Sequence, residues 1–262
     1  MRQRSKPEIN PGSTRNLLLA ALPPAERQRL SPFLTHVELK LDQPLIEPEE
    51  PIRYVWFPND AITSTIQRLS DGSSIESGMM GLEGMVGIQL WLRQRTTPQF
   101  TEVQIAGTAE RMDADVFLRE VVHKPSPLND LVAAYTHGFL VFCGQVAACN
   151  RLHSMDQRLS RWLTMVHNRI PDRTSFPLKQ EFLAEMLGVH RPTVSTAAGM
   201  LQKAGWITYS RGVINILDVE GLRSGACECY RIMEAQFDKI FDQPWIELAR
   251  QTEGQRRNNH RE

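Results

Sequence analysis

The chain has 262 residues, of which 41% are hydrophobic and 23% are charged, an ordinary composition for a globular protein. This length allows one large domain or two smaller ones, each with a substantial core. The 30 basic residues balance the 30 acidic residues, so the net charge is zero. This balance argues against a protein that coats nucleic acid non-specifically, although a sequence-specific reader needs only a local positive face.

The first 14 residues carry charges but no apolar run, so we expect a flexible lead and not a signal peptide. The four cysteines, Cys143, Cys149, Cys227 and Cys229, form no C-x-x-C pair. They suit a reducing cytoplasm better than a disulfide scaffold. Polar residues interrupt the most apolar stretch, so no segment is predicted to span a membrane. We therefore expect a cytoplasmic protein.

Residues 15–124 are expected to form a β-rich, sensor-like domain. Two short helices, separated at Pro23 and Pro24, precede short apolar runs that alternate with turn residues such as Asp71-Gly72. Many short strands at regular spacing are typical of a barrel or sandwich. Strands are predicted at 37–41, 54–57, 61–69, 74–80, 85–90 and 101–111, and a helix at 113–124.

A long helix is predicted within residues 125–153. Its apolar residues recur in steps of three and four, which is typical of a coiled-coil seam. We interpret it as a dimerisation helix, and the alternative is a core helix packed inside one subunit. The predicted seam consists of Val132, Tyr135, Phe139, Phe142, Val146, Cys149 and His153.

Cys149 and His153 lie one helical turn apart on this predicted seam. One hypothesis is a thiol switch or a metal bridge at the dimer axis. The plainer interpretation is that Cys149 fills the seam as a small apolar residue and His153 caps the helix end. Cys227 and Cys229 fall within a helix predicted at 218–243, where residues two apart face different sides and cannot easily share one ion. The sequence therefore predicts no metal site.

Residues 178–207 contain the most specific motif of the chain. Ala184 is small where two helices must cross, Gly188 follows where the first helix must end, and Val194 points into the shared core. This spacing of four and then six residues indicates a helix-turn-helix, whose second helix enters the DNA major groove.

Further elements surround this motif and complete a DNA-binding domain over residues 154–243. Ser154 is a candidate N-cap for a helix at 155–170. Two strands around the turn Arg211-Gly212 are expected to form the wing of a winged helix. The predicted elements are the helix 155–170, the helix-turn-helix 178–207, the strands 206–210 and 213–217, the helix 218–243 and a tail at 244–262.

The segment Gly188-Val189-His190-Arg191-Pro192-Thr193-Val194 resembles the start of the recognition helix in bacterial transcription regulators of the Crp/Fnr family. Gly84-Met85-Val86-Gly87 resembles the end of their β-roll. The resemblance covers residues 15–217. It implies an α+β fold with an N-terminal double-stranded β-roll, which is jelly-roll-like, a long dimerisation helix and a C-terminal winged helix-turn-helix. It also implies a homodimer that binds a palindromic DNA site.

Two departures from the family bear on cofactors. Members that bind cyclic AMP carry Gly-Glu and then Arg-Ser in a loop that cradles the phosphate. Here no Glu follows Gly87, and Arg93 and Arg95 lie in the wrong register, so we expect no dependence on cyclic AMP. Oxygen-sensing members hold an iron–sulfur cluster on N-terminal cysteines, and no cysteine precedes Cys143, so we expect no such cluster. No other cofactor is predicted, and the effector is not named by the sequence.

The predicted DNA-reading residues lie at the start of the second helix. Arg191 is expected to contact guanine in a bidentate manner. Pro192 fits a first-turn position, and relatives of the cyclic-AMP type have Glu there and Arg in place of Thr196, so a different half-site is expected. Base contacts are predicted for Arg191, Thr193, Ser195 and Thr196, of which the last two could instead touch phosphate. Phosphate contacts are predicted for Lys179, Gln180 and Arg211, and His190 and Pro192 are also predicted to lie at the DNA.

The expected partners are double-stranded DNA, a second copy of the chain and, for an activator, RNA polymerase. A signal is expected to reorient the DNA-binding domains about a hinge near His153–Ser154. We expect no enzyme, because no Ser-His-Asp spacing, Gly-rich phosphate loop or acidic metal cluster is evident. The alternative functions are a dimeric interaction scaffold and a redox or metal sensor with little direct DNA contact.

Overall fold

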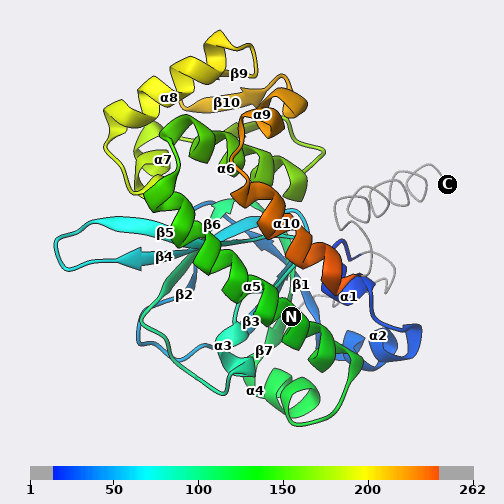
Figure 1. The fold of residues 1–262 in the computed structure, drawn as a ribbon. Helices are drawn as coiled ribbons and strands as arrows, with labels where there is room; N and C mark the ends of the chain where they lie inside the picture. Colours follow the sequence, from blue (N-terminus) through cyan, green and yellow to red (C-terminus); the bar gives the residue numbers. More distant parts are fainter. Residues whose placement is uncertain (1–13, 242–262) are drawn as a thin grey trace, which may run out of the picture.

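The computed structural model describes residues 14–241 (Figure 1). The expected lead, apart from Thr14, lies outside the described residues, as do the tail 244–262 and the end of the helix predicted at 218–243. β-Sheets form the N-terminal part, the long helix α5 crosses them diagonally, and a helical subdomain with a small sheet lies at the far end (Figure 1). This is the mixed α and β architecture expected from the sequence.

Two antiparallel sheets form the β-roll. One has the strand order β1-β7-β3, and the other has the order β2-β6-β4-β5. Apolar side chains from both sheets join one continuous core with the helices. The strands are β1 (Thr35–Leu39), β2 (Pro44–Ile46), β3 (Tyr54–Pro58), β4 (Ile62–Arg68), β5 (Ser74–Met80), β6 (Phe100–Ile105) and β7 (Gly107–Asp113).

Two strand predictions were wrong, for reasons that involve glycines. The run 101–111 is two strands, because the chain changes sheet at Gly107, where an added Cβ would lie 2.6 Å from the backbone of Asp60 and Ala61. The run 85–90 contributes only a bridge between Val86 and Trp56. Gly87 then adopts φ 98° and begins a short helix, α3 (Ile88–Trp91). β2 was missed altogether.

Short helices precede the first strand of the β-roll and follow its last strand in the sequence. At the start the two helices predicted around Pro23 and Pro24 are present, and after β7 the predicted helix 113–124 is present in two parts. These helices are α1 (Leu17–Ala20), α2 (Pro24–Leu30), a 3₁₀ turn (Ser31–Phe33), α4 (Ala114–Phe117) and a π-helical turn (Leu118–Val122).

The long helix α5 (Pro127–Leu152) has one face buried within the chain. It packs against β5 and against α10 (Cys229–Ile240), which lies beside it in Figure 1. The apolar residues predicted to form a dimer seam are on this inner face. Val132, Tyr135, Phe139, Phe142, Val146 and Cys149 are buried, and His153 is part-buried beside Cys229.

This placement corrects the seam interpretation in favour of the alternative, a face packed inside one subunit. The physical reason is that α10 supplies the partner helix from the same chain. Its Phe237 ring lies 6.2 Å from the rings of both Tyr135 and Phe142. The periodicity correctly identified a helix–helix contact but not which chain provides the second helix.

The opposite face of α5, which we call the outer face, is exposed and apolar. Leu140 is 60% exposed, and nothing lies within 4 Å of a Cβ added at Gly144. The outer face consists of the exposed residues His137, Leu140, Gly144 and Ala147 and the half-buried residues Val141 and Ala148, and His137 is its polar member. With both faces apolar, α5 is long and apolar enough to cross a membrane, but 39% of its most apolar window is buried inside the chain, as in a core helix.

The C-terminal subdomain is a winged helix-turn-helix. Ser154 and Gln157 form a capping box at the start of α6, as the candidate N-cap predicted. The wing is a three-stranded sheet of order β8-β10-β9, in which β8 was missed by the sequence analysis. The elements are α6 (Met155–Arg169), β8 (Ser175–Pro177), α7 (Gln180–Leu187), α8 (Arg191–Lys203), β9 (Ile207–Ser210), β10 (Val213–Ile216) and α9 (Val219–Gly225).

The helix predicted at 218–243 is two helices. α9 ends at Gly225 and α10 begins at Cys229, so Ala226, Cys227 and Glu228 form a connection. α9 packs closely on Trp206, whose ring would lie 2.4 Å from a Cβ added at Gly225. The chain then leaves the winged helix and returns along α5.

The winged helix docks onto the β-roll of the same chain through buried polar contacts. Arg169 of α6 pairs with Glu83, Nη2 to Oε1 2.7 Å, with both side chains fully buried. Trp162 Nε1 donates to Glu76 Oε1 of β5 at 3.2 Å. These contacts fix α6 against the β-roll.

Candidate DNA-binding face

Gly188 ends α7 in the left-handed conformation, with φ 60° and ψ 43°. Its N–H and that of Val189 bond to carbonyls of the last turn of α7, which closes the corner. Ala184 and Val194 are buried between α7 and α8, as their spacing predicted. The helix-turn-helix corner is therefore rigid and built from the residues that the motif indicated.

The start of α8 projects polar side chains into solvent. His190 is the N-cap and Pro192 lies in the first turn, where its missing N–H costs little. His190, Arg191, Pro192, Thr193, Ser195 and Thr196 are all exposed. The structure thus brings these predicted DNA-binding residues together on one surface at the N-cap and first two turns of α8.

Arg191 is held by neighbours on α7. Its Nε donates to Gln180 Oε1 at 3.2 Å, and its Nη1 pairs with Glu181 Oε1 at 2.9 Å. Ser195 Oγ also donates to Gln180 Oε1, at 2.9 Å. Both side chains of the Arg191–Glu181 pair are 62% exposed, so solvent screens it and a phosphate or base can replace Glu181.

The predicted phosphate-contact residues flank α8. Lys179 is the exposed N-cap residue of α7, and Gln180 begins that helix and is part-buried. Arg211 is exposed at the wing tip with φ 50°, and the next residue, Gly212, lies close to Lys179 Cγ at 3.7 Å from an added Cβ. The wing tip at Gly212 therefore lies beside Lys179 although the two are far apart in the sequence.

Sequence reasoning missed the role of Tyr209 in fixing the wing. Its Oη donates to Leu178 O at 2.7 Å, which ties β9 to the segment before α7. Burial raises the pKa of Tyr209 to about 12, so the phenol remains a neutral donor. The wing and the helix-turn-helix are thus held as one unit.

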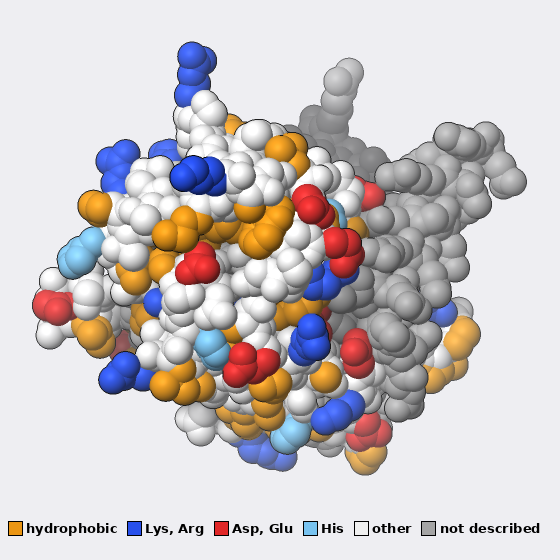
Figure 2. Space-filling model, turned by 45° about the horizontal axis from the view of Figure 1, so that its top comes forward, with side chains coloured by type: hydrophobic (Ala, Val, Ile, Leu, Met, Phe, Trp, Pro, Cys, Tyr) orange, Lys and Arg blue, Asp and Glu red, His pale blue; other side chains and the backbone are white. Residues whose placement is uncertain are grey.

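The winged-helix end, turned forward in Figure 2, has no continuous basic patch in that view: blue, red and orange side chains are interspersed. This fits the zero net charge of the chain. An interface of this kind depends more on a few placed side chains than on a general positive field.

The corner of the helix-turn-helix also contacts the β4–β5 hairpin. Ser74 Oγ donates to Glu185 Oε1 at 2.7 Å, and Ile75 Cδ1 would lie 2.5 Å from a Cβ added at Gly188. A groove lined by hairpin residues and by His190 and Thr193 continues from this contact. Any reorientation of the winged helix would therefore have to separate it from the hairpin.

A second group of chemically active side chains lies where α5 meets α6. Cys149, His153, Cys227 and Cys229 place their ligand atoms within 4.8 Å of one another. Cys143 lies outside this group, and burial raises the pKa of its thiol to about 11. The expectation that Cys227 and Cys229 face different sides was wrong, because Cys227 precedes α10 and is not helical.

The architecture and the site define a β-roll protein with a winged helix-turn-helix of the type that binds DNA. The family model of the Crp-like helix-turn-helix domain matches residues 157–224. This segment runs from the third residue of α6 to the last residue but one of α9. The match therefore coincides with the winged helix described above.

Solved structures extend the likeness to the whole fold. A putative Crp/Fnr-family transcriptional regulator from Eubacterium rectale matches with a TM-score of 0.62 at 16% identity, covering 80% of this chain and 98% of that one. FixK2 from Bradyrhizobium japonicum matches with a TM-score of 0.59 at 15% identity, covering 74% and 98%. The c-di-GMP-responsive regulator CLP from Xanthomonas campestris matches with 0.57 at 13%, covering 72% and 96%.

No curated protein sequence matches the chain. The chain therefore carries a Crp-like helix-turn-helix domain within the fold of Crp/Fnr transcriptional regulators. The resemblance drawn from the recognition-helix motif is confirmed at the level of domain and fold.

Proposed function

We propose that the chain is a cytoplasmic, homodimeric transcription regulator of the Crp/Fnr type that reads a palindromic DNA site and has no catalytic activity. The observation that carries the proposal is the rigid corner at Gly188, beyond which six predicted DNA-binding residues are exposed to solvent. Lys179 and Arg211 flank them at the positions where phosphates would lie beside a major-groove helix.

A second copy of the chain is the partner that we propose for the outer face of α5. Its exposed residues recur at helical spacing, and Gly144 leaves room for another backbone to approach. An apolar helix stripe exposed to water is stabilised by burial against an equivalent stripe. Two copies paired there would present two recognition helices with two-fold symmetry.

We propose that the β-roll does not respond to cyclic AMP. Arg95 pairs with Asp115 at 2.7 Å on the surface, and Arg93 is exposed. Rings of α5 lie against the β-roll instead: an added Cβ at Gly84 would lie 2.3 Å from Tyr135, and one at Gly78 would lie 2.5 Å from Phe139. These features support an effector-independent β-roll or one whose effector differs from a cyclic nucleotide monophosphate.

Selection from a random duplex library with the full-length protein tests the proposal. We expect enrichment of a palindrome whose half-site centres lie about 34 Å apart. The affinity for that site should fall linearly on a log–log scale with salt concentration, because phosphate contacts release counterions. A folded dimer that enriches no sequence would favour the alternative function, a dimeric interaction scaffold. Recruitment of RNA polymerase to DNA by this protein would then no longer be expected.

A further inference from the structure

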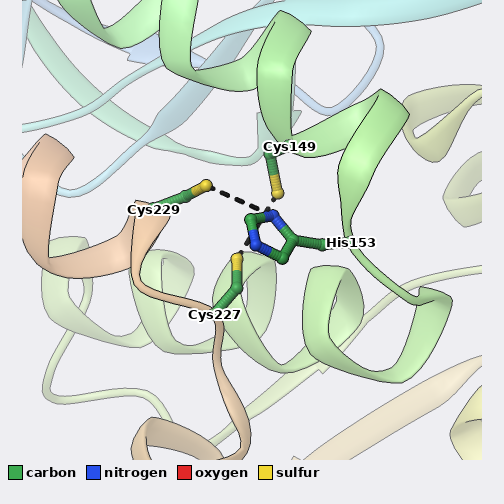
Figure 3. A group of neighbouring side chains, drawn as sticks. All are labelled: Cys149, His153, Cys227 and Cys229. Carbon is green, nitrogen blue, oxygen red and sulfur yellow. Dashed lines mark hydrogen bonds between the residues drawn. The ribbon is translucent and has the colours of Figure 1, made fainter.

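The Cys149–His153–Cys227–Cys229 group, which we call the hinge cluster, collects donors from two separate segments. Cys149 and His153 are four residues apart, so they share one face of the last turn of α5. Cys227 lies in the connection after α9, and Cys229 is the first residue of α10. Figure 3 shows the three thiols and the imidazole converging on one point.

The spacing of these atoms is that of a tetrahedral mononuclear site. Cys149 Sγ lies 3.5 Å from Cys227 Sγ, and Cys229 Sγ lies 3.4 Å from His153 Nδ1. All four ligand atoms lie within 4.8 Å of one another. A tetrahedron with arms of about 2.3 Å to sulfur has edges of about 3.8 Å, so an ion fits after side-chain shifts of at most about 1 Å.

The surroundings orient the ligands as second-shell groups do in metal sites. His153 Nε2 lies 3.3 Å from Glu228 Oε2, which leaves Nδ1 free to face the thiols. A carboxylate on the far nitrogen fixes the ring and raises its basicity toward a metal. Gln145 Nε2 donates to Cys229 Sγ at 3.1 Å, a bond that also stabilises a thiolate. The three cysteines are buried, and His153 is part-buried.

We propose that the hinge cluster is a Cys₃His site for one Zn²⁺ ion per chain. Three thiolates and a neutral imidazole are a donor set that zinc accepts in closed, structural sites. Binding forms three Zn–S bonds and one Zn–N bond and releases the three thiol protons to solvent. The bound centre carries one negative charge, and no oxidation or reduction is involved.

The position of the cluster gives the ion a mechanical role. The chain enters the winged helix at His153–Ser154 and leaves it at Ala226–Glu228. The entry from α5 and the exit to α10 therefore meet at the cluster, and α10 returns along α5 directly afterwards. A zinc ion there ties the two crossings together and fixes the angle between α5 and α6.

The inference that the ion regulates DNA binding rests on the proposed function. If the winged helix must swing about His153–Ser154 to align two recognition helices, the zinc-bound and zinc-free forms differ in DNA affinity. Loss of the ion removes the link between the two crossings. The caps of α5 and α6 and the hydrogen bond from Arg158 Nη2 to Asn150 Oδ1, at 2.9 Å, then hold the junction more weakly. Zinc availability would thereby regulate DNA binding.

Metal analysis of the full-length protein tests the site itself. We expect one zinc ion per chain in the wild type and in Cys143→Ser, which removes a half-buried thiol on the same helix outside the cluster. Cys227→Ser and Cys229→Ser should lose the ion, and Glu228→Gln should retain it with an affinity about 10–100-fold lower. His153→Gln serves as a further variant, because it is part-buried and leaves every cysteine in place.

Replacement of zinc by Co²⁺ supplies a spectroscopic readout. A tetrahedral thiolate site gives an intense charge-transfer band and strong visible d–d bands in the wild type and Cys143→Ser, and these weaken in the cluster variants. A metal-free protein without cobalt bands would overturn the proposal. A Cys149–Cys227 disulfide under reducing conditions, or the absorption of an iron–sulfur cluster, would overturn it equally.

DNA affinity with and without a chelator separates the regulatory step from the site. A change in affinity in the wild type that is absent from Cys229→Ser supports hinge control. Stoichiometric zinc with unchanged DNA affinity would reject hinge control while the site stands. Absence of DNA binding both with and without the chelator, in a protein shown to bind zinc, would instead contradict the proposed function.

Discussion

Arg169 of α6 and Glu83 of the β-roll form an ion pair in which both side chains have no exposed area, with Nη2 2.7 Å from Oε1. A second bond, from Nε to the same oxygen, is 2.9 Å long. The aliphatic part of Arg169 lies against Gly81, where an added Cβ would be 2.9 Å away. This pair holds the winged helix to the β-roll, so it is a junction between two functional parts and not only a core contact.

Glu83→Gln should lower the free energy of unfolding by about 3 kcal/mol, because it removes the carboxylate that forms the ion pair with a fully buried guanidinium. Urea denaturation at constant m-value measures the change. Arg95→Ala is the matched control, since it breaks a pair of equal length, 2.7 Å, whose side chains are 61% and 72% exposed. Equal effects of the two substitutions would show that burial does not determine the contribution of the pair.

Arg191→Ala should weaken binding to the selected DNA site about 10- to 100-fold and relax the preference at one base position, as expected for loss of a bidentate contact to guanine. Arg191→Lys should not restore the preference, because an ammonium group lacks the guanidinium fork. Competition binding against single-base variants of the site measures both effects. Arg231→Ala removes the same charge from the exposed side of α10 and should change neither.

Leu140→Glu should convert a dimer into a folded monomer, because it places a charge on the outer face without entering the core. Sedimentation velocity reports the mass, and circular dichroism confirms the fold. Leu69→Glu makes the same change at a side chain of similar exposure, 64%, on the β4–β5 hairpin. The proposal that the outer face pairs would be abandoned if Leu140→Glu remained a dimer.

Glu234 gives the protein a pH dependence of stability. Burial raises its pKa to about 7, with Arg169 opposing and Glu83 and Asp238 adding to the shift. In the unfolded chain the carboxyl ionises near its ordinary value of 4.5, so between these pH values the folded state holds the extra proton. Stability should therefore fall as pH rises from about 4.5 to 7, by roughly 3 kcal/mol, and then level off.

Glu234→Gln should remove this decline, because an amide keeps an acceptor for Asn168 Nδ2 but does not ionise. Denaturation midpoints at pH 5 and pH 8 provide the comparison. The variant should gain most over the wild type at pH 8. A gain confined to pH 5 would mean that the sign of the shift is reversed.

The helix-turn-helix was the part most fully predicted from the sequence. Its signal is local: Ala184, Gly188 and Val194 each have a steric reason to occupy their positions, and the reading residues follow in order along α8. The paired glycine and proline at its turn leave few alternative conformations. Motifs of this kind carry their geometry in adjacent residues.

The hinge cluster could not be predicted in the same way. It depends on the break between α9 and α10, and the amphipathic pattern continues through that break. Gly225, the last residue of α9, was the available signal, because glycine often ends a helix. Even with that break, only the return of α10 along α5 brings Cys229 to His153.

The inner face of α5 was misassigned for a related reason. Periodicity reports that Val132, Tyr135, Phe139 and their neighbours contact another element, but it does not identify that element. α10 lies about a hundred positions later in the sequence and supplies Phe237 to the same cluster of rings.

The cluster of rings between α5 and α10 also offers a route to chemical control. Phe142 is fully buried, with its ring centroid 6.1 Å from that of Phe139 and 6.2 Å from that of Phe237. Phe142→Ala would open a dry cavity beside the domain junction and cost about 3–5 kcal/mol. Apolar cavities of this kind admit benzene-sized guests. A guest of this size would restore part of the lost free energy of unfolding, so a small molecule added from outside would set the stability of the domain junction.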